Sequence, residues 1–175
     1  MIRWARLAEG TGHDAARALS HRLLESALPG ENGAFPELKP LSHTPEGRPF
    51  LPGRPGVHIS LTHCEGLAAC AVAVTPVGID AERLRTHSPY AARHAMGNAE
   101  LDAIRNARDP DIEFFRRWTL KESCLKAMGT GLGYPLKELG FFISGGKAVC
   151  ISRPEYGFWV YDLDGFVLAL CVKRH

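Results

Sequence analysis

The sequence predicts an α+β protein of two similar halves, residues 1–76 and 77–175, each a helix with an antiparallel sheet. Two observations support this fold class. A helical pattern, a glycine that stops it and a β-hairpin occur twice in the same order, and a shift of 99 residues aligns the two sets. The apolar runs are also of strand length, too short to span a bilayer. We expect the functional site between the halves, because such interfaces often form ligand pockets.

The alignment of the two halves can be followed residue by residue. The apolar hairpin strand 67–73 falls on 166–172 at this shift. Any two helix–hairpin units would align loosely, which is the competing explanation. We favour a duplicated α+β unit, because both helices stop and both hairpins turn at matching glycines. The matched pairs are Arg17 with Arg116, Gly30 with Gly129, and Gly66 with Gly165.

The first half begins with alternating apolar and polar residues over 1–7, which indicates a short strand. Asp14 is a candidate N-cap or first-turn acid for a helix over 15–28. Pro29 and Gly30 stop that helix. The rest of this half is predicted to be a loop over 31–56, rich in Pro and Gly, and two strands over 57–61 and 66–75.

The second half begins after Pro76 with a strand over 77–81, followed by a polar segment, 83–97, that passes into a short helix. The principal helix is predicted over 114–128, where an apolar face can hold it against a sheet. Gly129 ends this helix as a C-cap. The other predicted elements are a helix over 99–107 and strands around 139–144, 148–152, 158–163 and 166–173, the last two joined by a tight turn at Asp164-Gly165.

The composition excludes several classes of protein. The 175 residues are 45% hydrophobic and 23% charged, which is ordinary for a soluble globular protein. The 21 Lys and Arg against 19 Asp and Glu give a net charge of +2, and no long block of like charge suggests a nucleic-acid or membrane partner. Five cysteines without a C-x-x-C pair indicate reduced thiols. We expect a cytoplasmic protein.

Acidic side chains point to a metal site. Asp80 and Glu82 are two residues apart on a predicted strand, so both leave the same face. Gly78 beside them permits close approach of a ligand or of another backbone segment. Hard oxygen donors of this kind suit Mg²⁺, and Glu122 could complete a three-carboxylate set. A solvated strand end is the competing explanation for Asp80 and Glu82 taken alone.

The principal helix adds a cation to this set. Glu122 and Lys126 are four residues apart, so they lie one turn from each other on one face. A lone pair of this kind is usually solvated. Together with Asp80 and Glu82, the pair suggests carboxylates and cations that converge on a phosphate-rich ligand.

Four motifs, taken in order and spacing, resemble those of the 4′-phosphopantetheinyl transferases, in particular the larger monomeric type. They are Gly47-Arg48-Pro49, the segments 57–63 and 77–82, and W-x-x-K-E-x-x-x-K-x-x-G-x-G-L over 118–132. The resemblance implies transfer of the phosphopantetheine arm of coenzyme A to a serine of an acyl or peptidyl carrier protein, with release of 3′,5′-ADP. It also implies a monomer whose two similar halves hold coenzyme A between them.

The resemblance also assigns roles to residues. Asp80, Glu82 and Glu122 become the Mg²⁺ ligands. Glu122 is also the candidate base for the carrier serine hydroxyl, but metal ligation is its firmer role, with base or water-positioning second. Asp80, Glu122 and Lys126 form the catalytic set, in which Lys126 contacts the phosphates. The residues implied to bind coenzyme A are Arg17, Arg48, Thr62, His63, Lys121 and Lys126, with His63 near the 3′-phosphate.

The segment 83–97 corresponds to the region that meets the carrier protein. Carrier proteins are acidic, so Arg83, Arg85 and Arg93 would form a basic rim around apolar anchors at Leu84, Tyr90 and Met96. A solvated loop is the competing explanation for this segment.

Two other functions stay open from the sequence. The segment before the first helix is shorter than in the larger transferases, which would suit a non-catalytic relative that only binds coenzyme A or carriers. A metal-dependent phosphohydrolase of a nucleotide pyrophosphate would also use three acids and nearby lysines.

Overall fold

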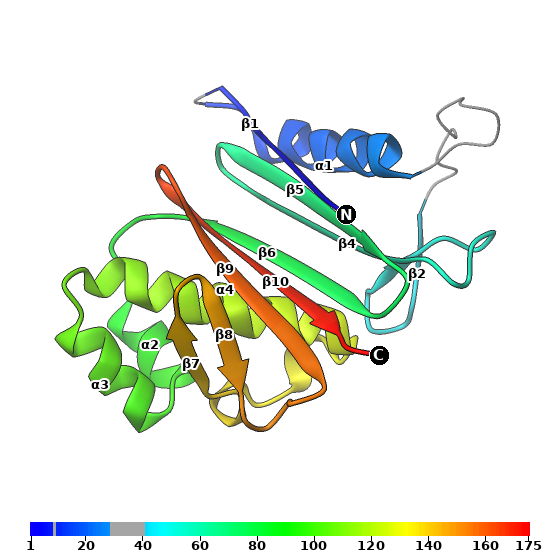
Figure 1. Cartoon of the computed structure of the whole chain (residues 1–175). Helices are drawn as coiled ribbons and strands as arrows, with labels where there is room; N and C mark the ends of the chain where they lie inside the picture. The colour runs from blue at the N-terminus through cyan, green and yellow to red at the C-terminus, as the bar shows by residue number, and fades with distance from the viewer. Residues whose placement is uncertain (9, 29–40) are drawn as a thin grey trace.

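The computed structural model describes residues 1–8, 10–28 and 41–175 and confirms the α+β class (Figure 1). Two main antiparallel sheets form its frame. One has three strands in the order β1-β5-β4, and the other has five in the order β6-β10-β9-β8-β7. Among the described helices, none combines the length and the apolarity needed to cross a bilayer.

The three-stranded sheet consists of β1 (Ile2–Arg6), β5 (Leu67–Ala73) and β4 (His58–Cys64), and α1 (His13–Ala27) packs against it. The helix begins two residues before the predicted start, with Gly12 as N-cap and Asp14 in its first turn. The predicted stop at Pro29 and Gly30 lies outside the described residues. The region expected to be a loop contains a short strand pair, β2 (Ser42–His43) and β3 (Pro49–Phe50).

The five-stranded sheet has β6 (Val77–Arg83) at one edge and β7 (Phe141–Ser144) at the other. Between them in the sheet lie β10 (Phe166–Lys173), β9 (Tyr156–Leu163) and β8 (Lys147–Cys150). Three α-helices and two short 3₁₀ turns stand between β6 and β7 in the chain. They are α2 (Pro89–Ala95), α3 (Asn98–Asn106), α4 (Pro110–Met128), Gly131–Gly133 and Leu136–Glu138.

The long helix α4 starts four residues before the predicted start. Asp109 caps it by accepting hydrogen bonds from the backbone N–H groups of Asp111 and Ile112. Pro110 follows in the first turn, where its missing N–H group costs no helical hydrogen bond. Gly129 ends the helix in the left-handed conformation with a φ of 72°, which confirms the predicted C-cap.

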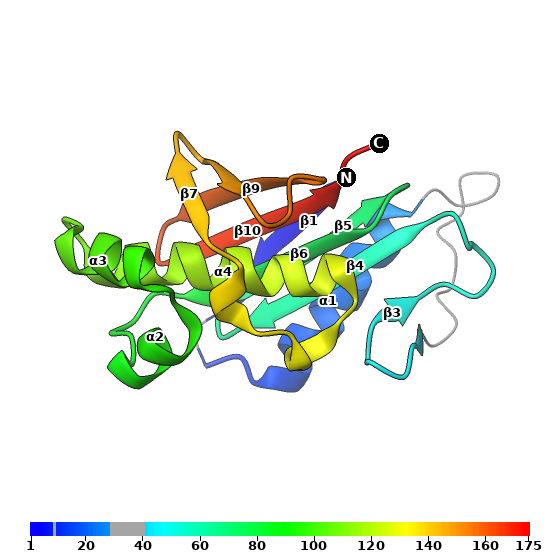
Figure 2. The ribbon, with the colours of Figure 1, turned by 90° about the horizontal axis from the view of Figure 1, so that it is seen from below.

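Gly78 allows α4 to lie directly on β6 (Figure 2). A Cβ atom at Gly78 would be 1.9 Å from the carbonyl oxygen of Ser123 and 2.6 Å from the amide nitrogen of Ala127. The close approach expected at this glycine is therefore that of another backbone segment, the C-terminal half of α4. This contact brings the side chains of α4 to Asp80 and Glu82, which share the face of β6 with Gly78.

The strand order repeats between the sheets, as the pattern in the sequence predicted. The order β1-β5-β4 corresponds to β6-β10-β9, and the two hairpins are closed by Cys64 opposite Leu67 and by Leu163 opposite Phe166. Their turns contain Gly66 and Gly165, both at positive φ. The second half differs by the α2–α3 segment, which is inserted between its first strand and its helix.

The two sheets meet through side chains. The hydroxyl of Ser60 on β4 accepts a hydrogen bond from the backbone N–H of Ile79 on β6 at 3.0 Å. At the hairpin tips, Arg6 pairs with Asp164 at 3.2 Å, and Arg83 pairs with Glu65 at 2.8 Å. These two ion pairs are reciprocal, because each joins the end of a first strand in one half to the hairpin turn of the other.

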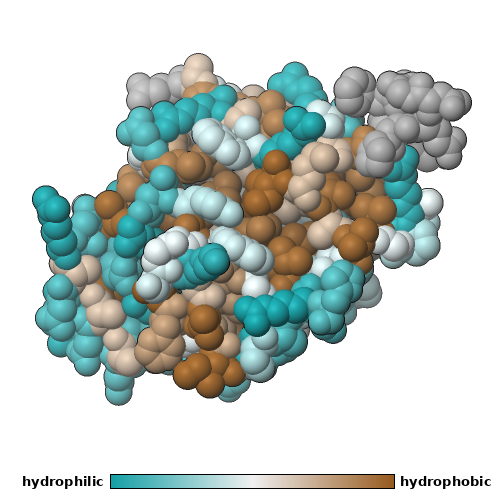
Figure 3. All heavy atoms as spheres, viewed as in Figure 1, coloured by the Kyte–Doolittle hydropathy of each residue, from teal (hydrophilic) through white to brown (hydrophobic). Residues whose placement is uncertain are grey.

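Apolar side chains also fill the space between the sheets. The core there includes Leu67, Ile79 and Leu168, whereas the opposite face of β10 packs against α4 through Val167 and Ala169. On the face shown in Figure 3, apolar side chains gather between the sheets. A hollow of about 190 Å³ lies among the side chains Ile2, Trp4, Tyr161, Leu163 and Leu168.

Candidate active site

Lys126 and Asp80 form the centre of the candidate site. The Lys126 ammonium donates hydrogen bonds to Asp80 Oδ1 at 2.7 Å and to the backbone carbonyl of Ile79 at 3.0 Å. Asp80 is only 7% exposed, and Thr62 also donates its hydroxyl hydrogen to Asp80 Oδ1 at 3.3 Å. The carboxylate is thus fixed by two donors, one from each half of the chain.

Thr62 has a different position from the one predicted. The strand β4 runs through Thr62 and His63 to Cys64, so these residues lie in the strand and not in the hairpin turn. The buried Thr62 hydroxyl donates to Asp80 and accepts from the backbone N–H of Ala81 at 3.3 Å. The Thr62 hydroxyl, which was predicted to bind the ligand, is therefore already hydrogen-bonded to Asp80 and Ala81.

Glu122 lies within electrostatic reach of the other two acids. Burial raises the pKa of the Glu122 carboxyl group, and the negative charges of Asp80 and Glu82 raise it further, while Lys126 lowers it. Glu82 itself pairs with Arg85 at 2.9 Å. The negative charges of Asp80 and Glu82 thus act on Glu122, and a cation between these groups would relieve their repulsion.

The described residues contain no group of three or more His, Cys, Asp or Glu side chains already arranged as metal ligands. Asp80 is turned to Lys126, and Glu82 is turned to Arg85. The donor set nevertheless fits a hard divalent cation in its chemistry, because it consists of carboxylate oxygens whose charges repel one another. A shared cation at Asp80, Glu82 and Glu122 stays a prediction.

Histidine and arginine side chains collect beside this centre. His63 Nε2 lies 2.9 Å from Nε2 of His13, a residue that the sequence analysis missed. Burial lowers the pKa of His63, and the nearby charges of His13, Lys126 and Arg17 lower it further. His13, Arg17 and His21 follow one another at four-residue intervals on α1, so they share a face of the helix.

A cavity of about 270 Å³ opens next to Lys126 and Glu122. Arg48 lies at its wall: a Cβ atom at Gly129 would be 3.3 Å from Arg48 Cδ, so the arginine passes close to the end of α4. Arg48 Nη2 is also 3.2 Å from His58 Nδ1. Residues from both halves line this cavity: Glu46, Gly47, Arg48, Pro49, Ile59, Ser60, Leu61, Glu122, Leu125, Lys126, Gly129 and Gly131.

Comparison with known proteins identifies the family. The family model described as the 4′-phosphopantetheinyl transferase superfamily matches residues 76–171, which contain Asp80, Glu82, Glu122 and Lys126. The chain belongs to this superfamily.

Curated relatives in the superfamily include a 4′-phosphopantetheinyl transferase of Bacillus subtilis, 30% identical over 73% of this chain and 60% of its own length. The 4′-phosphopantetheinyl transferase HetI of a Nostoc species is 36% identical over 63% of this chain and 50% of that relative. The chain therefore matches about half to three-fifths of the length of these relatives.

The fold is also found among solved structures of the superfamily. The holo-[acyl-carrier-protein] synthase of Thermotoga maritima is similar with a TM-score of 0.50 and 26% sequence identity. The alignment covers 57% of this chain and 63% of that structure. This likeness supports the antiparallel α+β fold described above.

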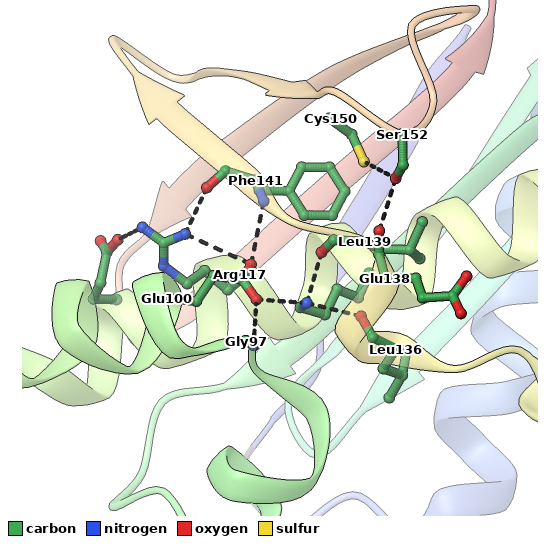
Figure 4. A network of polar contacts seen from close by, with 11 residues as sticks. Gly97, Glu100, Arg117, Leu136, Glu138, Leu139, Phe141, Cys150 and Ser152 are labelled. Atoms are coloured by element: carbon green, nitrogen blue, oxygen red, sulfur yellow. Dashed lines mark hydrogen bonds and ion pairs between the residues drawn. The ribbon is translucent and has the colours of Figure 1, made fainter.

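Lys121 corrects one of the sequence assignments. Its side chain is fully buried, and its ammonium donates hydrogen bonds to Glu100 Oε2 and to the carbonyl oxygens of Leu136 and Leu139 (Figure 4). A lysine enclosed in this way cannot contact coenzyme A or a carrier protein, so the ligand-binding role implied by the superfamily motif is wrong for Lys121.

The segment 83–97 is also only partly as expected. Tyr90 is 74% exposed, and Arg85 and Arg93 lie at the surface. Met96, however, is buried in the core beneath α2 and α4, and Leu84 packs against that core. These two side chains are therefore structural, and Tyr90 is the apolar anchor that the surface offers.

Proposed function

We propose that this protein transfers the 4′-phosphopantetheine arm of coenzyme A to a serine of an acyl or peptidyl carrier protein and releases 3′,5′-ADP. The observation that carries the proposal is the Asp80–Lys126 pair at 2.7 Å, with Glu122 beside it at a cavity lined by both halves. Membership of the superfamily and the printed names of its relatives support the same activity.

The phosphates of coenzyme A are the natural ligands of the cationic groups in the site. Lys126 and Arg48 line the cavity, Arg17 contributes positive charge beside it, and the His63 imidazole lies near these cations. Lys126 would hold the pyrophosphate while still hydrogen-bonded to Asp80, and Arg48 would contact it from its place near the end of α4. His63, with Arg17 and His13, would bind the 3′-phosphate.

Asp80, Glu82 and Glu122 would hold Mg²⁺. Bound there, the ion would neutralise charge on the pyrophosphate and on the departing 3′,5′-ADP. Thr62 orients Asp80 for this role through its hydroxyl, and the pairing of Asp80 with Lys126 limits the rotation of the carboxylate.

In the transfer step, the serine oxygen of the carrier forms a bond to the β-phosphorus of coenzyme A. The bond from that phosphorus to the oxygen of 3′,5′-ADP breaks, and the leaving oxygen takes the electron pair. Glu122 is a candidate acceptor of the serine proton, because its burial raises its pKa above that of an exposed carboxylate. Metal ligation is its firmer role, since a bound cation weakens a carboxylate as a base.

The carrier would dock on the segment 83–97. Arg85 and Arg93 supply positive charge for an acidic partner, and Tyr90 supplies an exposed aromatic ring. Within this proposal the protein acts in the cytoplasm as a monomer, and the monomer is supported by one chain supplying cavity residues from both halves.

Transfer of a labelled arm from coenzyme A to apo-carrier proteins, with and without Mg²⁺, tests the proposal. Asp80→Asn and Glu122→Gln should each lower the rate about 100-fold or more. Asp102→Asn is the matched control, because Asp102 is a surface carboxylate on α3 that pairs with Arg105. Release of 3′,5′-ADP without any carrier would indicate a phosphohydrolase, and binding of coenzyme A without turnover would indicate a non-catalytic relative.

A further inference from the structure

Lys121 and Glu100 form a buried ion pair on the side of α4 away from the candidate site. The Lys121 ammonium lies 2.7 Å from Glu100 Oε2, and both side chains are at most 5% exposed. Lys121 directly precedes Glu122 in the chain, so the two side chains leave the helix about 100° apart. The same helical turn therefore presents one residue to the site and the other to the interior.

Glu100 joins several segments besides α4. Its Oε2 also accepts a hydrogen bond from the backbone N–H of Gly97, the N-cap of α3, at 3.1 Å. Its Oε1 accepts from the backbone N–H of Phe141, at the start of β7, at 3.2 Å. One carboxylate thus ties the junction between α2 and α3 to the sheet and, through Lys121, to the helix of the site (Figure 4).

Lys121 also binds the loop between α4 and β7, which we call the return loop. Its ammonium donates to the carbonyl oxygens of Leu136 at 2.9 Å and Leu139 at 2.6 Å. The 3₁₀ turn Leu136–Glu138 in this loop packs against α2. The ammonium therefore holds both neighbours of α2, the α3 cap on one side and the return loop on the other.

We propose that Lys121 is a positioning residue for carrier docking: through Glu100 and the return loop it fixes α2 on α4, so that the segment 83–97 stands at a set distance from Glu122. This inference rests on the proposed function. The helices α2 and α3 are the insertion that distinguishes the second half from the first, and α2 carries Tyr90 and Arg93 of the surface assigned to the carrier.

The buried ion pair is better explained by a role in positioning α2 and α3 than by a contribution to the stability of the fold alone. A buried ion pair adds little net stability compared with apolar side chains, because both charges lose their hydration. The ion pair does, however, require one relative position of α3, α4 and the return loop, since any shift of α3 or of this loop leaves a buried charge without its partners. Arg117 strengthens the arrangement by donating to the Phe141 carbonyl at 2.6 Å and to Glu113 at 2.7 Å.

Steady-state transfer kinetics with Lys121→Met and Glu100→Gln test the proposal. We expect the KM for the carrier to rise about tenfold or more, while the KM for coenzyme A and kcat stay within about twofold. Arg105→Met is the matched control, because it removes a cation from the exposed face of the same helix, α3. It should leave all three parameters unchanged. Glu100→Gln keeps the side-chain shape and decides the matter if Lys121→Met does not fold.

Two results would overturn the proposal. One is an unchanged KM for the carrier in a folded Glu100→Gln variant. The other is a loss of coenzyme A affinity, measured by calorimetry, with the carrier KM unchanged, which would restore a ligand-facing role to Lys121.

Amide hydrogen exchange separates this proposal from the proposed function. Faster exchange over 84–97 in Glu100→Gln, and not in Arg105→Met, supports the positioning role. Equal exchange in the two variants overturns it. This readout needs no turnover, so it decides the positioning role even if the wild-type protein modifies none of the carriers tested.

Discussion

Replacement of Gly78 by alanine tests the packing on which the site depends. The added Cβ would lie 1.9 Å from the Ser123 carbonyl oxygen, whereas ordinary contact begins at 3.4 Å. The shortfall is about 1.5 Å, and the three nearest atoms, from Ser123 and Ala127, all belong to the backbone of α4, so no side chain can turn away. The helix must therefore move off β6.

The cost can be estimated from overpacked cores. Such substitutions cost about 1–3 kcal/mol, and the obstructing backbone places Gly78→Ala near about 3 kcal/mol. For a chain of this size we expect Tm to fall by about 6–12 °C. A retreat of α4 would also separate Lys126 from Asp80, now 2.7 Å apart, so transfer activity should fall about 100-fold.

Thermal unfolding and the transfer assay measure both effects on the same preparation. Gly140→Ala is the control, because a Cβ atom there would meet nothing within 4 Å, and it should melt within about 1 °C of the wild type. If Gly78→Ala also melted within about 2 °C and kept its activity, direct contact of β6 with the backbone of α4 would be refuted.

Two further predictions concern the first half. In chemical denaturation, Thr62→Val should lower the free energy of unfolding by about 1–3 kcal/mol and Thr62→Ser by much less, because valine leaves the buried N–H of Ala81 without its acceptor. Equal stabilities of the two variants would contradict the hydrogen bond. The folded-state pKa of His63 is lowered from 6.5, so folding disfavours the protonated form of this side chain. The stability that His63 contributes is therefore present above pH 6.5 and is lost as the pH falls through its folded-state pKa. In melts between pH 5 and 8, His63→Gln should therefore lose less stability on acidification than the wild type, and parallel curves would contradict the assignment.

Much of the site could be predicted because its spacing follows the two regular periodicities. Asp80 and Glu82 are separated by a strand period, and Glu122 and Lys126 by a helical turn, so each pair was placed on one face from the sequence alone. The duplicated hairpins were found in the same way, from apolar runs that end at Gly66 and Gly165.

The errors have physical causes. Lys121 was assigned to the ligand because the motif that resembles the family places a lysine at this position, and nothing in the local sequence indicates that Glu100, 21 residues away, is its partner. His13 was missed because the predicted helix began after it, which removed it from the four-residue series with Arg17 and His21. The start of α4 was placed too late, at 114, although Pro110 fits the first turn of a helix.

The joint between the sheets has a consequence for how the molecule can be divided. The connection at Val74 is 73% exposed, and a cut there would leave Asp80, Glu122 and Lys126 on one fragment and Arg17, Arg48 and His63 on the other. Neither fragment would carry a whole site, and activity would return only when the Ser60 and Thr62 hydroxyls and the crossed pairs at the hairpin tips had brought the fragments together again. Turnover by mixed fragments would thus report how accurately these polar contacts, together with the apolar core between the sheets, set the angle between two sheets.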